Sequence, residues 1–229
     1  MWSLNGGVAL SYLGAWAAGT YQPGQIVVDN GVEYMCVRTT TKRPTGWPGS
    51  AATTYGTSLP ASPVDGQEAV LVDSITNPQY VWRFRYNASS TQAYKWEFVG
   101  GYPYWTAVVG AENFNGINAW VDANTNVGPQ IAAPRAGQYN ISASASIASS
   151  TASAACYIGI CIGAGSPVDP FQGFVGAGVA NTYMTVAIPF GAGWFTAAQG
   201  DLIRMRYLAA AGSGSIAKRN LAIQPLRVS

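Results

Sequence analysis

Residues 80–86 read YVWRFRY, and this stretch decides the fold class of the chain. Its aromatic residues alternate with two arginines, as in a strand whose side chains point in turn to two faces. Residues 94–98, YKWEF, repeat the pattern with Lys95 and Glu97 on the outer face, and residues 70–72, VLV, add a third run of strand formers. Turn signals separate the three runs. We expect a three-stranded meander with one aromatic face, too small to be stable without a packing partner.

The segment around this meander contains sequence motifs that are unusual in combination. It contains PVDGQE at residues 63–68, an Arg-Tyr-Asn step at 85–87 and AYKWEFVGG at 93–101. Through these motifs, residues 59–101 resemble a segment found in tail and fibre proteins of bacteriophages. The resemblance implies a virion protein, whereas the strand pattern alone indicates only a small β-meander.

The composition is poor in charge. Charged residues make up 10% of the 229 residues, against roughly 25% in an average soluble domain. A surface of neutral polar groups is often partly buried in an oligomer. The net charge of +2, without a basic stripe, argues against nucleic acid as a partner. We also expect no membrane insertion, because no apolar run reaches about eighteen residues. Residues 1–7 lack the features of a signal peptide, so we expect folding in the host cytoplasm.

The residue types needed for most catalytic chemistry are scarce. The chain has no histidine, which excludes a Ser-His-Asp or Cys-His site, and no nucleotide-binding motif precedes a helix. Glu112 and Asp122 are the least implausible pair for a glycosidase, but surface polar groups are the default interpretation. Cys156 and Cys161 lie in one expected strand, and we interpret both as small buried residues. We therefore expect a protein that is not an enzyme and has no metal and no cofactor.

Residues 15–49 carry a second resemblance. Trp16, Tyr21, an Asn-Gly hairpin signal at 30–31 and Tyr34 resemble the chitin-binding modules of carbohydrate-binding families five and twelve. Those modules are small three-stranded folds that hold sugar on exposed aromatic faces. Residues 38–40, RTT, depart from the adjacent aromatics found there. Trp16, Tyr21 and Tyr34 are either the core of a tiny domain, which we favour, or a sugar platform. Trp47, between Gly46 and Pro48, is the better candidate for an exposed ring.

From residue 106 onward the chain shows short strands separated by turns and no helical period. The alternation is clearest over 137–147, where Tyr139 and Ile141 begin an apolar face opposite serines and an asparagine. Regularly spaced strands of this kind predict a β-sandwich. The expected strands cover 107–109, 118–121, 130–132, 137–147, 153–162, 183–189, 202–208 and 221–228.

Three sequence motifs give this region a third resemblance to a known family. They are APRAGQYNI at residues 133–141, AAQGDLIR at 197–204 and RNLAIQPLRV at 219–228. Residues 106–229 are similar to jelly-roll domains of the complement-C1q and tumour-necrosis-factor type, which also occur as trimeric tips of phage fibres. The resemblance implies a homotrimer with the last strand near its axis.

Together these observations predict an all-β protein with small N-terminal three-stranded modules and a C-terminal jelly-roll sandwich. The expected divisions are 1–58, a carbohydrate-binding-module-like attachment or spacer unit, 59–105, the meander, and 106–229, the trimerising domain. The expected function is that of a bacteriophage virion structural protein, a tail- or capsid-attached fibre or spike for host attachment. The alternatives are a capsid decoration protein and a soluble glycan-binding module.

The expected partners follow from this interpretation. They are further copies of the chain, other phage virion proteins and a host cell-surface glycan. Sugars offer C–H faces to aromatic rings and hydroxyl groups to hydrogen bonds, so exposed loop aromatics are the candidate ligand-binding residues. The candidates are Trp47, Phe171, Phe174 and Trp194. For Trp194 we favour packing at the end of the sandwich or in the trimer interface.

Overall fold

The computed structural model describes residues 11–15, 17–29, 32–36, 39–41, 53–167, 171–176 and 179–229. The chain forms two compact units, Met1–Ala52 and Thr53–Ser229. Every regular element in the described residues is a strand, and no helix occurs among them, which confirms the all-β prediction.

The first unit is built on a three-stranded sheet of β1 (Ser11–Ala15), β2 (Gln25–Asp29) and β3 (Val32–Met35). The antiparallel pairing of β2 with β3 confirms the expected hairpin, while β1 runs parallel to β2. Tyr21 is buried, and its hydroxyl donates to the carbonyl of Ala17, which confirms Tyr21 as a core residue. Tyr34 is half-buried, and Trp16 and Trp47 lie outside the described residues.

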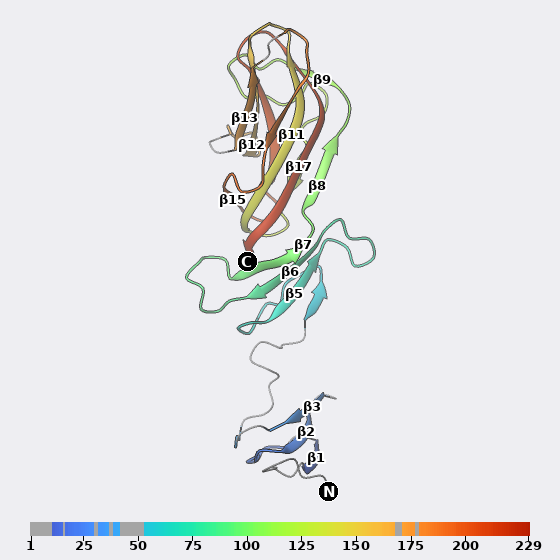
Figure 1. Ribbon diagram of the computed structural model, residues 1–229, viewed down its shortest axis with the longest axis vertical. Coiled ribbons are helices and arrows are strands. Elements are labelled where there is room, and N and C mark those ends of the chain that lie inside the picture. Colours follow the sequence, from blue (N-terminus) through green and yellow to red (C-terminus); the bar gives the residue numbers. More distant parts are fainter. Residues whose placement is uncertain are drawn as a thin grey trace, which may run out of the picture. The chain divides into compact units, whose positions relative to one another are not determined.

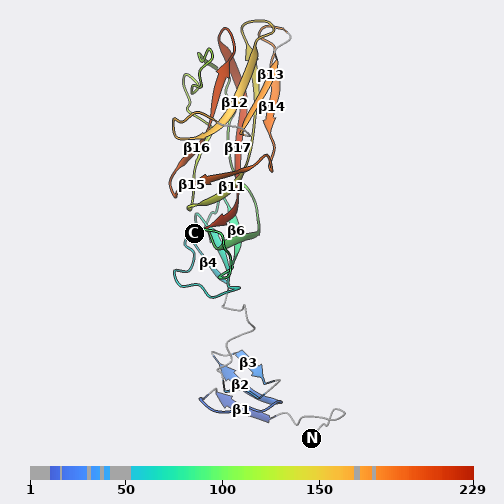
Figure 2. The same cartoon turned by 90° about the vertical axis from the view of Figure 1, so that its left-hand side faces the viewer.

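The second unit contains a ten-stranded sheet and a four-stranded sheet. Figure 1 shows β11 and β17 side by side in the nearer layer, with β12 and β13 in the fainter layer behind, and Figure 2 shows the layers from the side. Fourteen strands make up this unit: β4 (Thr54–Gly56), β5 (Glu68–Val72), β6 (Val81–Tyr86), β7 (Trp96–Gly101), β8 (Tyr104–Val108), β9 (Glu112–Phe114), β10 (Gln130–Ala132), β11 (Gly137–Ser149), β12 (Ala155–Ile162), β13 (Gln172–Gly176), β14 (Met184–Ile188), β15 (Trp194–Ala197), β16 (Leu202–Ala209) and β17 (Gly214–Val228).

The strand order of the sandwich is compatible with a jelly roll. One layer has β8 and β9 on one side of β17, then β11, then β14 and β15. The other layer has the order β10-β16-β12-β13. Counting β8 with β9 and β14 with β15, each layer has four strand positions, and most connections pass from one layer to the other. Eight positions in two packed sheets are the arrangement of a jelly roll.

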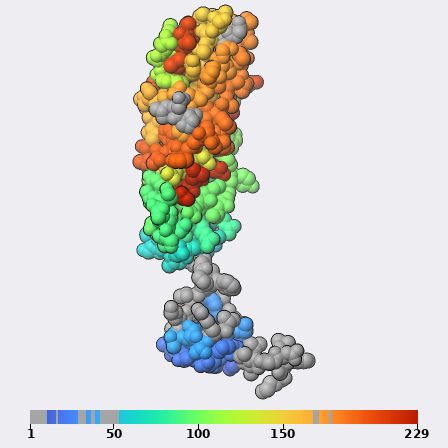
Figure 3. Space-filling view, turned by 60° about the vertical axis from the view of Figure 1, so that its left-hand side comes forward, coloured from blue at the N-terminus to red at the C-terminus, as the bar shows by residue number. Residues whose placement is uncertain are grey.

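The meander is continuous with the larger sheet. Strands β4 to β7 extend it, because β7 pairs with the end of β17. Trp82 and Phe84 are fully buried whereas Arg83 and Arg85 are exposed, as the alternation predicted. The Trp82 ring centroid lies 6.3 Å from that of Tyr139 in the sandwich. Figure 3 shows the red atoms of the C-terminal strand meeting the green atoms of the meander. Residues 59–105 are therefore part of the same compact unit as 106–229, which corrects the expected boundary at residue 105.

Several strand limits also differ from the expectations. No strand forms over residues 118–121, where only isolated bridges at Ile117 and Val121 contact the edge of β16, and β17 begins at Gly214 instead of residue 221. A bulge in β17 explains part of this difference. Lys218 has a positive φ of 48°, and the register with β11 shifts beside it, so that the extra residue breaks the simple alternation.

Candidate functional site

The outer surface of the β11–β17 layer is nearly free of charge. Across it, Ala107, Asn220, Ser144 and Ala187 stand opposite one another on β8, β17, β11 and β14. Since side chains alternate along each strand, the residues two positions away belong to the same surface. We call this surface the neutral face: Trp105, Ala107, Asn140, Ser142, Ser144, Ser146, Thr185, Ala187, Trp194, Ala217, Asn220, Ala222 and Gln224.

Two tryptophans lie at opposite edges of the neutral face. Trp105 on β8 is 65% exposed and stands opposite Ala222, and Trp194 on β15 is 64% exposed and stands opposite Asn140. A large exposed ring on either side of small neutral residues leaves apolar area in water unless a partner covers it. Trp194 does not plug the end of the sandwich, because it is largely exposed.

The outer surface of the four-stranded layer carries a different feature. Tyr157 on β12 stands opposite Phe174 on β13, with ring centroids 5.4 Å apart and ring planes at 33°. The Trp120 ring meets Tyr157 edge-on, at 6.4 Å and 76°. We call these three rings the aromatic strip. Phe174 is 66% exposed, and the other two are half-buried.

The four ring residues singled out in the sequence do not form one site. Phe174 belongs to the aromatic strip and Trp194 to the neutral face, on opposite layers of the sandwich. Both lie in strands, although their glycine neighbours indicated turns. Phe171 is only 5% exposed and packs edge-on against Phe195 at 5.1 Å, so the expectation of an exposed ring at 171 is wrong. Trp47 lies outside the described residues.

Glu112 takes part in a buried network. The fully buried guanidinium of Arg219 donates to its carboxylate, and the backbone N–H groups of Asn126 and Thr125 donate at 2.8 and 3.0 Å. Burial alone would raise the pKa of Glu112, but hydrogen bonds from Asn126, Arg219 and Thr125 outweigh it and lower the pKa to about 2. The carboxylate thereby anchors the 125–126 turn to the sandwich.

Asp122 is also bound by arginines. Its carboxylate lies 3.5 Å from Nη2 of Arg204 and 3.8 Å from Nε of Arg206. Both members of the candidate glycosidase pair are thus paired with cations of the β-sandwich, as structural carboxylates usually are.

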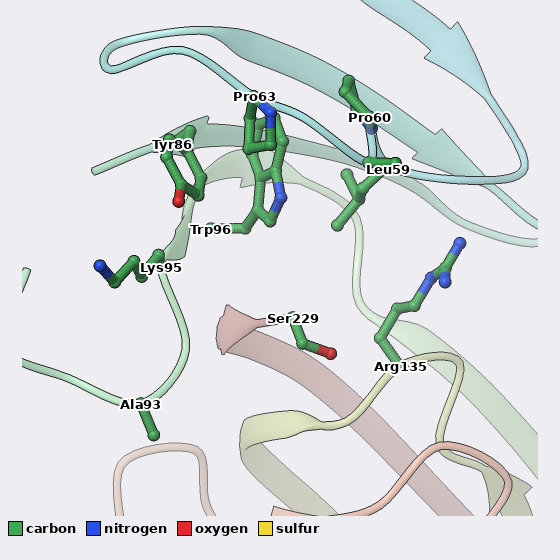
Figure 4. Close-up of a pocket in the computed structure, with 10 residues that line it drawn as sticks. Leu59, Pro60, Pro63, Tyr86, Ala93, Lys95, Trp96, Arg135 and Ser229 are labelled. Carbon is green, nitrogen blue, oxygen red and sulfur yellow. The ribbon is translucent and has the colours of Figure 1, made fainter. Parts of the chain in front are cut away.

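An open hollow of about 480 Å³ lies where the meander meets the end of β17 (Figure 4). Two cations border it, but Figure 4 shows their head groups pointing apart. Lys95 donates to the carbonyl of Ala88 at 3.0 Å, and Arg135 donates to that of Thr57 at 3.3 Å. The hollow therefore offers no convergent charge to a ligand. Its lining consists of Leu59, Pro60, Ala61, Pro63, Tyr86, Ala93, Lys95, Trp96, Arg135 and Ser229.

Metal and thiol chemistry find little support in the part of the chain that the structure describes. No group of three or more metal-ligating side chains occurs within it. Burial raises the pKa values of Cys156 and Cys161, which disfavours the reactive thiolate form. Across the same residues, no helix is long and apolar enough to span a membrane.

No protein-family model matches the chain. No curated protein matches it significantly. The neutral face and the aromatic strip must therefore be interpreted from their own chemistry.

Proposed function

We propose that this chain is a bacteriophage virion structural protein, a tail- or capsid-attached fibre or spike that assembles as a homotrimer and takes part in host attachment. The observation that carries the proposal is the neutral face with its two exposed tryptophans. The motifs of residues 59–101 that resemble phage tail and fibre proteins support the virion assignment. Other copies of the chain and neighbouring virion proteins are its partners.

The neutral face supports self-association for a physical reason. Small uncharged side chains such as Ser144 and Ala222 let two backbones approach without the cost of desolvating charges. Trp105 and Trp194 supply large apolar rings of the kind that dominate interface energies. Lys218 and Arg227 are the charged residues of β17 that border this face, and Arg227 lies 3.5 Å from Glu97.

Light scattering of the purified chain tests the assembly. We expect a mass of about 72 kDa, three times the 24.0 kDa of the chain. Ser144→Arg places a long cation at the centre of the neutral face and should give a folded monomer. Thr91→Arg, at an exposed site in the loop before β7, is the matched control and should remain a trimer. A wild-type monomer at micromolar concentration, or a trimeric S144R variant, contradicts the proposed interface.

A cryo-EM map of the intact phage particle tests the virion assignment. Density for the two units on a tail or capsid appendage is the expected result. Density spread over the capsid lattice would assign the chain to shell decoration. Absence of the chain from purified particles by mass spectrometry would exclude a virion role.

A further inference from the structure

We propose that the aromatic strip of Trp120, Tyr157 and Phe174 is a binding site for a neutral saccharide. Its biological meaning rests on the attachment function proposed above, since a fibre that contacts a cell surface meets polysaccharide there. The inference adds two residues, Trp120 and Tyr157, that the sequence did not single out, and it names the class of ligand.

The geometry of the strip suits a sugar ring. Tyr157 and Phe174 lie on neighbouring strands with ring centroids 5.4 Å apart and ring planes at 33°, so the two rings contact each other as a tilted, partly stacked pair. Leu208 stands opposite Tyr157 on β16 and extends the apolar surface of this pair. Trp120 rises at 76° to Tyr157 and closes one end. The C–H face of a pyranose can stack on the exposed ring of Phe174, and neighbouring sugar units can contact Tyr157 and Trp120 along the strip.

The strip is held in place before any ligand binds. A Cβ at Gly159 would lie 2.8 Å from Cη2 of Trp120 and 2.5 Å from Pro167. The indole therefore lies over a strand position that only glycine leaves open. Two residues after Trp120, Asp122 is held by the guanidinium groups of Arg204 and Arg206, which fix the segment that carries the indole. A prebuilt site loses little conformational entropy on binding.

Charge favours a neutral ligand over an acidic one. Arg206 is a cation beside the strip, because it stands opposite Gly159, two residues along β12 from Tyr157. Its guanidinium donates to the carbonyls of Ala164 and Gly165, each at 2.9 Å, and its side chain is only 14% exposed. It is therefore committed to the protein and is not presented to a carboxylate of the ligand.

The size of the strip favours a saccharide over a protein partner. A stable protein interface buries about 800 Å² on each side. A large aromatic side chain buries about 150–250 Å² in all, and Trp120 and Tyr157 are already half-buried in the fold. The area left on three rings is too small for a protein partner and is sufficient for a few sugar units.

Binding to neutral polysaccharides is the direct test. The full-length chain is run in native gels containing β-1,3-glucan, β-1,4-glucan, galactan or mannan, and is titrated with chitooligosaccharides in a calorimeter. Polygalacturonate is the charged comparison. We expect retention by at least one neutral polymer and none by polygalacturonate. Phe174→Ala should weaken the binding roughly tenfold or more, since it removes the most exposed ring of the site.

Tyr102→Ala is the matched control. Its ring is 77% exposed, more than that of Phe174, and lies outside the strip between β7 and β8. This variant should bind as the wild type does, and both variants should melt at the wild-type temperature. Binding of no neutral probe, binding of polygalacturonate alone, or an unchanged affinity in F174A overturns the inference.

The saccharide inference and the attachment function can fail separately. If F174A loses saccharide binding while phage carrying it adsorb normally, the site exists but does not mediate attachment. If the chain is absent from the particle but binds a neutral polymer through Phe174, the virion role fails and the saccharide site remains.

Discussion

Glu112 and Arg219 lie 107 residues apart in the sequence and meet in the interior of the second unit. Arg219 is fully buried, and the Glu112 side chain is only 7% exposed. Removing one partner of such a pair leaves the other charge buried without compensation, and this costs far more than the loss of an exposed pair. The pair of Glu68 with Arg83 offers the contrast, because its side chains are 30% and 55% exposed.

We predict that Glu112→Gln lowers the free energy of unfolding by roughly 2–4 kcal/mol at pH 7. The matched variant Glu68→Gln should cost less than about 1 kcal/mol. Urea denaturation followed by tryptophan fluorescence measures both values. Equal losses in the two variants would mean that the buried network does not stabilise the fold.

The pH dependence of this stabilisation has a definite sign. The pKa of Glu112 falls from 4.5 to about 2 on folding, so the unfolded chain takes up its proton first. The stabilisation is complete above about pH 4.5 and is lost as the pH falls towards 2. We therefore expect the stability difference between wild type and E112Q to shrink over this interval in denaturation series. A constant difference from pH 6 down to pH 2.5 would contradict the assignment.

Gly214 is another residue whose role depends on a distant partner. It stands opposite Phe114 on β9, and a Cβ at Gly214 would overlap the fully buried Phe114 ring. We predict that Gly214→Ala lowers the free energy of unfolding by about 1–3 kcal/mol, because the ring must move in a packed core. Gly100→Ala in β7 is the control, since nothing lies within 4 Å of its Cβ position. Similar stabilities of the two variants in thermal melts would disprove the overlap.

At the scale of elements, the sequence predicted those strands whose side chains alternate without interruption. Trp82, Phe84 and Tyr139, Ile141 are buried on the expected faces, because the two-residue period is a local property. The start of β17 was missed because the bulge at Lys218 interrupts that period. β13 and β15 were missed because Gly173 and Gly193 resemble turn residues, although pairing with neighbouring strands keeps these segments extended.

The bulge in β17 can be tested at one position. Lys218 has a left-handed backbone, with φ at 48°. A β-branched side chain is strained there whereas glycine is not. We predict that Lys218→Val lowers the free energy of unfolding by about 1–2 kcal/mol and that Lys218→Gly does not lower it. Chemical denaturation of the two variants measures the difference. A stable K218V would show that the backbone at this position is extended.

The aromatic strip shows what sequence patterns could not supply. Phe174 was singled out for its ring and its glycine neighbours, but Trp120 and Tyr157 come from a loop and another strand. Only the register of β12 against β13, and the bare Gly159 under the indole, bring the three together. Long-range pairing of this kind leaves no local period in the sequence. The composition did predict the low charge that the neutral face displays.

At the scale of the whole molecule, the second unit begins before the meander. A fragment of residues 106–229 cuts β8 and removes Trp82 from its place beside Tyr139. We predict that this fragment melts about 10 °C or more below a fragment of residues 53–229, since it loses large buried aromatics. Calorimetry of the two fragments compares them. Equal melting temperatures would restore the boundary at residue 105.

Strand β17 pairs with β7, β8, β9 and β11, and it is the last strand of its unit in the chain. During translation, these four strands emerge from the ribosome before the segment that joins them. Until residues 214–228 have emerged, each of the four has an exposed hydrogen-bonding edge on that side, and such edges invite pairing with other nascent chains. Native folding of the second unit is therefore delayed until its synthesis is almost complete. Several chains translated on one polysome would reach this stage close together, where the proposed homotrimer could begin to assemble.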